Sequence, residues 1–298
     1  MNQAATAQRV TGPLVWLDMD QKALDDAYDQ LVYAPNRDQV HLRNSFNSER
    51  VRQRLGAPKR LAYGPTPFEQ LDLFATTKPN APVHVFIHGG AWRQRSAKDY
   101  AFLAEMFVRA GAHFIALDFA GVENTNGDLL PMADQVRRAV AWVYTNAKSF
   151  GGDPNRLYIS GQSSGAHLAG NVVTTDWKEY GVPADIVKGA LLCSGMYDLK
   201  PVRLSKRSAY VAFTDESEDK LSSQRHLDRL NCPVIVAYGT YETPEFQRQS
   251  RDFAAAVKAA GKPLTLLVGE GYNHFEMTEM IGNPLSLIGS AVLEQMKL

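Results

Sequence analysis

The sequence predicts an α/β fold in which a mostly parallel central sheet is covered by helices on both faces. From about residue 70 onward, apolar runs of strand length alternate with helix-period stretches of ten or more residues. This alternation is typical of repeated βαβ units. The strand-length runs are largely apolar, as expected for parallel strands that are buried on both faces.

The expected elements follow in chain order. A helix is expected over residues 21–32, because its apolar side chains recur on one helical face, and a polar helical segment follows near residues 46–54. Strands are expected over residues 71–74, 83–87, 113–117, 156–160, 190–194, 234–238 and 264–268. Further helices are expected over residues 97–110, 131–149, 164–174, 246–260 and 284–297.

The whole chain, residues 1–298, is expected to form a single domain. Length alone favours two domains, but α/β folds often reach this length as one unit. Residues 14–60 and 200–228 do not fit the alternation of strands and helices. We expect these two segments to form a small cap over the carboxyl ends of the strands, where ligands bind in open α/β sheets.

Charge and composition exclude several classes of protein. The chain has 32 Lys and Arg against 32 Asp and Glu, and a net charge of zero argues against a general nucleic-acid binder or a polybasic membrane anchor. No run approaches the length of a membrane span, and the first twenty residues lack the pattern of a secretory signal. A soluble, cytoplasmic protein is therefore expected.

The chain contains two cysteines, Cys193 and Cys232, and both lie in apolar stretches. Two are too few for a disulfide framework or a four-cysteine zinc site. We expect both to be reduced and buried, and we expect no metal and no organic cofactor.

The strongest chemical signal is Gly161-Gln162-Ser163-Ser164-Gly165, which lies directly between an expected strand and an expected helix. This G-x-S-x-G motif in that context is typical of a nucleophile elbow. The sharp turn would present the Ser163 hydroxyl at the top of the sheet. The amide of Ser164, at the start of the helix, is a candidate oxyanion donor.

A second signal, His88-Gly89-Gly90-Ala91-Trp92, follows the strand at residues 83–87. An HGG-type loop upstream of the nucleophile supplies the other oxyanion donors in α/β-hydrolases. Gly89 and Gly90 are the candidates, because a β-carbon there would keep the amide from the substrate oxygen.

A serine nucleophile needs a base that accepts its proton. His274 lies in a loop after the strand at residues 264–268, where the base falls in the chain order Ser, acid, His. His88 is expected to brace the oxyanion loop, and His167 to point along its helix and away from Ser163. The other histidines are expected within strands (His84 and His113) or in irregular segments (His41 and His226).

The acid that orients the base should follow the strand at residues 234–238. Thr243 has the character of an N-cap and Pro244 that of a first helical residue, which leaves Glu242 outside the helix and free to reach His274. Glu245 falls in the first turn, where a carboxylate suits the helix dipole. Glu242 is favoured, and Glu245 is the alternative.

Taken together, HGGAW, GQSSG with its GAHLAG helix, GALLCSGMYDL, ETPEFQRQS and GYNHFEM resemble the kynurenine formamidase (arylformamidase) group of the α/β-hydrolase superfamily. The group is related to the hormone-sensitive-lipase-like esterases, and the resemblance covers roughly residues 60–290. It implies the α/β-hydrolase fold, with cleavage of N-formylkynurenine to kynurenine and formate and activity on small aryl esters. It also implies Ser163 as nucleophile, His274 as base and Glu242 as acid.

Three residues depart from the pattern of that group. Aspartate is the more usual acid at the position of Glu242. Gln162 and Ser164 flank the nucleophile where histidine or aspartate and alanine are more often seen.

Three further residues are candidates for substrate binding. Trp92, beside the oxyanion loop, could stack on an aromatic substrate, with a place in the core as the alternative. Tyr272 and Asn273 flank the base and are candidates to line the pocket.

The sequence therefore predicts a serine hydrolase that cleaves a small amide or ester through an acyl-enzyme. An N-formyl arylamine such as N-formylkynurenine is the preferred substrate. A carboxylesterase for short-chain or aryl esters is the alternative, and a non-catalytic ligand-binding module on a hydrolase scaffold is a second one. The partner is a small molecule, and the oligomeric state, a homodimer included, is left open. The balanced net charge also leaves open whether the pocket holds local positive charge for an amino-acid carboxylate.

Overall fold

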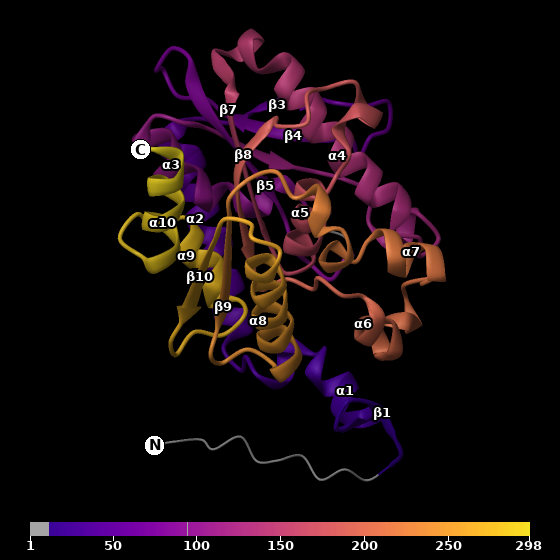
Figure 1. The fold of residues 1–298 in the computed structure, drawn as a ribbon. Helices are drawn as coiled ribbons and strands as arrows, with labels where there is room; N and C mark the ends of the chain where they lie inside the picture. Colours follow the sequence, from indigo (N-terminus) through magenta and orange to yellow (C-terminus); the bar gives the residue numbers. More distant parts are fainter. Residues whose placement is uncertain (1–11, 94) are drawn as a thin grey trace.

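The computed structural model describes residues 12–93 and 95–298, which fold around an eight-stranded sheet (Figure 1). The strand order is β10-β9-β8-β7-β5-β6-β4-β3. The strands from β10 to β6 in this order are parallel, and β4 and β3 pair antiparallel at one edge. Their bounds are β3 Lys59–Ala62, β4 Gln70–Phe74, β5 Ala81–Ile87, β6 His113–Leu117, β7 Gly152–Gln162, β8 Val187–Cys193, β9 Val234–Gly239 and β10 Leu264–Gly269.

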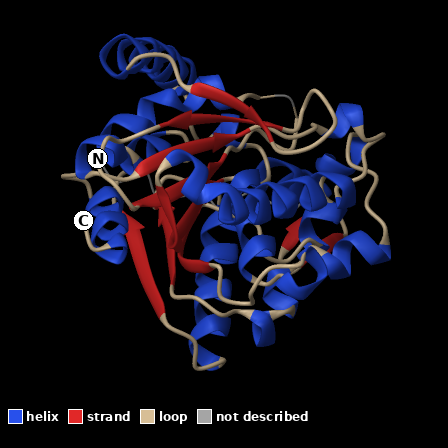
Figure 2. Ribbon diagram, turned by 90° about the horizontal axis from the view of Figure 1, so that it is seen from above, coloured by secondary structure: helices blue, strands red, loops and turns tan. Residues whose placement is uncertain are grey.

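Helices cover both faces of this sheet (Figure 2). One apolar core lies under α4 (Leu130–Asn146), α5 (Ser164–Val173) and α8 (Pro244–Ala259). The other lies under α2 (Arg37–Leu55), α3 (Ala104–Ala110), α9 (Glu276–Ile281) and α10 (Leu287–Met296). Successive strand residues alternate between the two cores, as Val85 and Phe86 do, so both faces of the strands are apolar. The predicted sheet with helices on both faces is confirmed.

All seven predicted strands are present, with ends that differ by a few residues. Strand β3 was not predicted, because it is a short and largely exposed edge strand without an apolar run. The segment at residues 97–110 begins as a 3-10 turn, Ala97–Leu103, and becomes α-helical only in α3.

The prediction of one helix over residues 21–32 is wrong in its second half. Helix α1 spans Gln21–Ala27, and a separate 3-10 turn follows at Gln30–Val32. The side chain of Asp29 accepts a hydrogen bond from the Leu31 amide and thereby caps that turn. As a result Leu31 and Val32 are exposed and do not continue the buried face of the helix.

The two segments outside the alternation occupy different places. A small hairpin, β1 (Leu14–Trp16) and β2 (Met19–Asp20), and α1 pack with α6 (Lys200–Leu204). In Figure 1 these elements lie close together, with α7 (Asp215–Lys220) further along the same side. Helix α2 begins well before the predicted residue 46. It packs against the 3-10 turn Ala97–Leu103 and against α3. His41 was predicted to lie in an irregular segment, but it lies in α2.

Both cysteines are buried and free, which agrees with the prediction. Burial raises the pKa of the Cys232 thiol to about 12, and it also raises the pKa of Cys193. Neither thiol is therefore a reactive thiolate near neutral pH.

None of the described helices is long and apolar enough to cross a membrane.

His84 is a fully buried histidine on β5. Its ring stacks on Phe107 with the centroids 4.0 Å apart, and its Nε2 lies 2.7 Å from the Ser160 hydroxyl. Burial lowers its pKa to about 3, whereas the unfolded chain keeps a value near ~6.5. Between these values the unfolded state binds a proton that the folded state does not, so stability falls as the pH falls from ~6.5 toward 3.

We expect a His84→Phe variant to lose this contribution to acid sensitivity. Phenylalanine preserves the stacking, so the slope of unfolding free energy against pH should decrease by up to about 1.4 kcal/mol per pH unit below ~6.5. Urea titrations between pH 4 and pH 7 measure that slope. The matched control is Ser160→Ala, which removes the hydrogen bond but keeps the imidazole and should keep the slope. Equal slopes in wild type and His84→Phe would contradict the prediction.

Candidate active site

Ser163 occupies a strained turn directly between β7 and α5. Its φ is 59° and its ψ is −127°, a region that residues other than glycine rarely adopt. The turn needs both flanking glycines. A β-carbon on Gly161 would lie 2.2 Å from the Gly165 carbonyl oxygen, and one on Gly165 would lie 2.1 Å from the Ile87 carbonyl oxygen. The local sequence therefore forms the sharp bend expected of a nucleophile elbow.

The elbow is anchored to the sheet and enclosed. The Ser163 amide donates to the carbonyl of Cys193 at the end of β8, at 3.0 Å. Ser163 is 6% exposed and His274 is 3% exposed. The nucleophile candidate thus lies in a site that is largely shielded from bulk water, where electrostatic interactions are strong.

The loop after β5 passes directly over the elbow. A β-carbon on Gly89 would lie 3.0 Å from the Ser163 Cβ, and Gly90 has a φ of +118° that favours glycine. The Trp92 amide donates to the Ser164 hydroxyl at 3.1 Å and ties the loop to the elbow. No acceptor among the described residues takes the amide hydrogens of Gly89, Gly90 or Ser164. These three amides are therefore free to donate to an oxyanion.

Glu242 and His274 form a buried pair. The Nδ1 atom of His274 lies 2.7 Å from Oε2 of Glu242. The other carboxylate oxygen, Oε1, accepts from the Gly239 amide at 2.7 Å and from the Ser194 hydroxyl at 2.6 Å. These two donors fix the carboxylate so that Oε2 faces the imidazole.

Glu245, the alternative acid, does not contact the base. Its carboxylate binds the Arg248 guanidinium at 2.6 Å and accepts from the Tyr28 hydroxyl at 2.9 Å. Of the two acids that the sequence left open, the structure places only Glu242 against His274. Thr243 caps α8 as predicted, with its side chain accepting from the Phe246 amide, and this cap holds Glu242 outside the helix.

The base loop is held beside the elbow by Gln162. Its side-chain amide donates to the His274 carbonyl at 3.0 Å. The Phe246 ring packs edge-on against the imidazole at a centroid distance of 4.8 Å.

All parts of the site lie at or after the carboxyl ends of five neighbouring strands, β5, β7, β8, β9 and β10. The site therefore lies where ligands bind in open α/β sheets.

Two residues of this arrangement were not predicted as parts of the site. Ser194 orients Glu242 but carries no motif, and its only signal is its place directly after a strand. Gln162 was noted only as a departure from the family pattern, and its side chain turns out to bridge the elbow and the base loop.

Trp92 does not offer its ring to a ligand in the described structure. It is 1% exposed, and its indole nitrogen donates to Nδ1 of His167 at 3.1 Å. His167 in turn contacts the Leu221 carbonyl through Nε2, and burial lowers its pKa to about 3. The structure thus places the indole in the core, the alternative that the sequence left open, where it braces the oxyanion loop.

The side chain of Asn273 makes hydrogen bonds within the fold. The Nδ2 atom donates to Asn36 at 2.7 Å, and Oδ1 accepts from the amides of Phe275 and Glu276. Tyr272 is exposed, and its carbonyl accepts from the Tyr241 amide.

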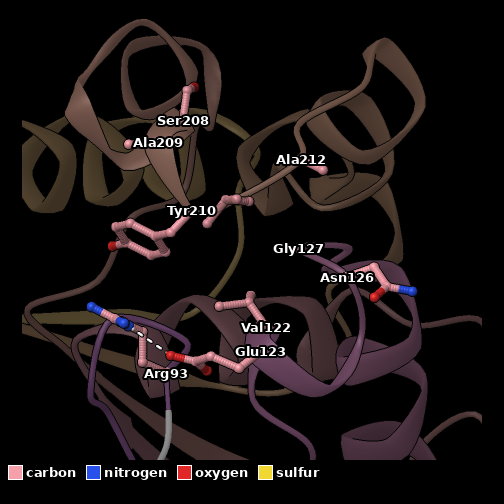
Figure 3. Close-up of a pocket in the computed structure, with 10 residues that line it drawn as sticks. Arg93, Val122, Glu123, Asn126, Gly127, Ser208, Ala209, Tyr210 and Ala212 are labelled. Carbon is pink, nitrogen blue, oxygen red and sulfur yellow. Dashed lines mark hydrogen bonds and ion pairs between the residues drawn. The ribbon is translucent and has the colours of Figure 1, made fainter.

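A cavity of about 400 Å³ lies beside the oxyanion loop, between residues 122–127 and residues 208–212 (Figure 3). Arg93 pairs with Glu123 on one wall, and its guanidinium lies 5.4 Å from the Tyr210 ring centroid. Neither Ser163 nor His274 lines this cavity.

Comparison with known proteins gives a consistent set of relatives. A protein-family profile described as BD-FAE matches residues 71–188. The kynurenine formamidase of Danio rerio is 32% identical over 254 residues, which cover 83% of this chain and 84% of that protein. The kynurenine formamidase of Salmo salar is 33% identical over 242 residues, which cover 78% and 80%. An isoprenylcysteine alpha-carbonyl methylesterase of Arabidopsis thaliana is 26% identical, over 78% of this chain and 58% of its own length.

Solved structures agree on the fold. A suggested thioesterase from a Silicibacter species has a TM-score of 0.77 at 22% identity and covers 90% of this chain and 97% of its own. The esterase Est2 of Thermogutta terrifontis has a TM-score of 0.63 at 21% identity and covers 80% and 90%. At these identities the likeness shows the fold alone, which is that of the α/β-hydrolase esterases.

Proposed function

The chain belongs to the kynurenine formamidase family of α/β-hydrolases, and on that premise we propose that it hydrolyses N-formyl arylamines such as N-formylkynurenine. The enzyme is of the serine-hydrolase type. The observation that carries the proposal is the buried Glu242–His274 pair, whose base loop is tied by Gln162 to the nucleophile elbow that holds Ser163. A nucleophile, a base and an orienting acid are the groups that acyl transfer through a covalent intermediate needs.

In the proposed reaction, Ser163 Oγ attacks the formyl carbon while Nε2 of His274 accepts the hydroxyl proton. Glu242 keeps the other imidazole proton on Nδ1 and stabilises the imidazolium that forms. The two donors on the far oxygen of Glu242 hold the acid in place during this step.

The amides of Gly89, Gly90 and Ser164 donate to the negative oxygen of the tetrahedral intermediate. The carbon–nitrogen bond then breaks, and His274 gives its proton to the departing aryl nitrogen. A formyl ester on Ser163 remains. His274 deprotonates a water molecule that attacks this ester, and formate leaves as the serine regains its proton.

Relative rates on two substrates test the proposal. We expect kcat/KM for N-formylkynurenine to equal or exceed kcat/KM for phenyl acetate, because binding contacts to the aryl amino acid add to transition-state stabilisation. Steady-state assays of purified protein measure both values. A value for N-formylkynurenine that is orders of magnitude lower would leave carboxylesterase as the function.

The carboxylesterase alternative has support of its own, since esterases are among the similar structures and a plant methylesterase is among the relatives.

The non-catalytic alternative predicts an unreactive serine. Labelling with an organophosphonate, read by intact-protein mass and mapped to Ser163, separates it from either enzyme. An unlabelled Ser163 would count heavily against catalysis.

We also propose a cytoplasmic location and a small-molecule substrate as partner. Two free, buried cysteines support a reducing compartment. Cell fractionation with an antibody to the chain tests the location.

A further inference from the structure

Arg207 is a buried cation without a carboxylate partner. It lies in the 3-10 turn Lys206–Ala209, which follows α6. Arg207 is 6% exposed, and no other lysine or arginine among the described residues is buried. Its neighbour Lys206 pairs with Asp29, whereas no described carboxylate forms an ion pair with Arg207.

The donors of the Arg207 guanidinium are only partly used. Nη1 donates to the Tyr210 hydroxyl at 2.9 Å, and Nη2 donates to the Tyr28 carbonyl at 3.1 Å. Nε is buried and meets no acceptor among the described residues. A buried charge without a counter-charge is unfavourable, and an arginine with unused donors matches the geometry of a carboxylate.

The guanidinium lies against two aromatic rings that contact the proposed catalytic region. Its Cζ is 5.5 Å from the ring centroid of Trp92, whose amide holds the elbow residue Ser164. It is also 6.0 Å from the ring centroid of Phe246, which packs on His274. Arg207 therefore lies within cation–π distance of one ring that belongs to the oxyanion loop and of one ring that packs on the base.

Space for a ligand adjoins this cation. Tyr210, whose hydroxyl accepts from Arg207, lines the cavity of about 400 Å³ (Figure 3). In Figure 3 its ring extends toward Arg93, whose charge is already compensated by Glu123. Arg207 does not itself line the cavity, and Tyr210 connects the two.

We propose that Arg207 binds the carboxylate on the leaving-group side of the substrate and so selects N-formyl arylamines that carry an amino-acid carboxylate over neutral ones. This inference rests on the proposed function and names the residue that sets its specificity. The positive charge is local, because the chain as a whole has no net charge.

The test compares an anionic and a neutral substrate that share the reacting amide. Arg207→Met keeps an unbranched, flexible side chain, shorter than that of arginine, and removes the charge. The ratio of kcat/KM for N-formylkynurenine to kcat/KM for formanilide should fall by about 10- to 100-fold, the scale of a lost charge-assisted hydrogen bond. The loss should lie mainly in KM, because the carboxylate does not react.

Matched variants separate recognition from folding. Arg203→Met removes a nearby arginine that is already paired with Asp215 and Glu218, and it should keep the wild-type ratio. Arg207→Lys keeps the charge and should give an intermediate ratio. If Arg207 only supports the fold, its loss lowers both activities alike, and an unchanged ratio in Arg207→Met overturns the inference.

The wild-type measurement distinguishes the two proposals. If wild type prefers N-formylkynurenine to formanilide and Arg207→Met keeps that preference, the inference fails while the function stands. If wild type shows no preference between them, the inference alone fails. If wild type cleaves phenyl acetate and neither formamide, the proposed function fails and the inference falls with it.

Discussion

A Ser163→Ala variant is expected to fold as the wild type does and to lose about 10⁶-fold in kcat, the scale of loss when a triad serine is removed. No described residue is hydrogen-bonded to the Ser163 hydroxyl, so the substitution leaves no buried partner unsatisfied. Alanine takes the same φ of 59° at a similar strain. Release of the arylamine from N-formylkynurenine measures kcat, and thermal unfolding with circular dichroism checks the fold.

The neighbouring serine provides the matched control. Ser164→Ala removes a hydroxyl that accepts from the Trp92 amide but keeps the backbone amide that we propose as an oxyanion donor. A lost hydrogen bond of about 1 kcal/mol corresponds to less than tenfold in rate. Phosphonate labelling should persist in Ser164→Ala and vanish in Ser163→Ala. Turnover near the wild-type level in Ser163→Ala would refute the assignment of the nucleophile.

Glu242→Gln is expected to lower kcat by about 10⁴-fold, the scale seen when a triad acid becomes an amide. The reason lies in the two donors, the Gly239 amide and the Ser194 hydroxyl, that fix one carboxylate oxygen. In the variant the amide oxygen takes that position, and the amide nitrogen then faces Nδ1 of His274. A donor there forces the imidazole proton onto Nε2, the atom that must accept the proton of the serine. Stopped assays of kcat across pH check this result.

Glu245→Gln distinguishes this effect from a general loss of negative charge. Glu245 is buried against Arg248 and the Tyr28 hydroxyl and lies away from His274. Its variant should keep kcat close to the wild-type value and lower the thermal midpoint, because a buried ion pair loses one charge. If Glu245→Gln lowered kcat more than Glu242→Gln did, the acid would have to be reassigned to Glu245.

The local backbone around the candidate site has the form that the sequence predicts. The elbow needs only a strand, a turn and a helix that are contiguous in the chain, with glycines at residues 161 and 165. The N-cap at Thr243 and Pro244 also lies within one helical turn and is sufficient to place Glu242 outside α8. Such features depend on backbone sterics over a few residues, which the sequence records directly.

The sequence does not show where a side chain meets a distant segment. Trp92 donates a hydrogen bond to His167, and Asn273 donates one to Asn36, and no motif in the sequence indicates either contact. Leu31 had the right spacing to continue the buried face of α1, yet the helix ends before it and leaves it exposed. Helical periodicity shows that a face could be buried, but it does not show whether a partner covers that face.

The sequence by itself determined the order of strands and helices, the elbow at Ser163, and the positions of Glu242 and His274 relative to their strands. These follow from local sterics and from the burial of continuous apolar strands. Only the tertiary structure decided that Ser194 and Gln162 hold the acid and the base loop, and that Arg207 is buried without an ion pair to a described carboxylate. Those contacts join segments far apart in the chain, such as Arg207 and Tyr28, and they form because buried polar groups must find partners wherever the fold brings them together.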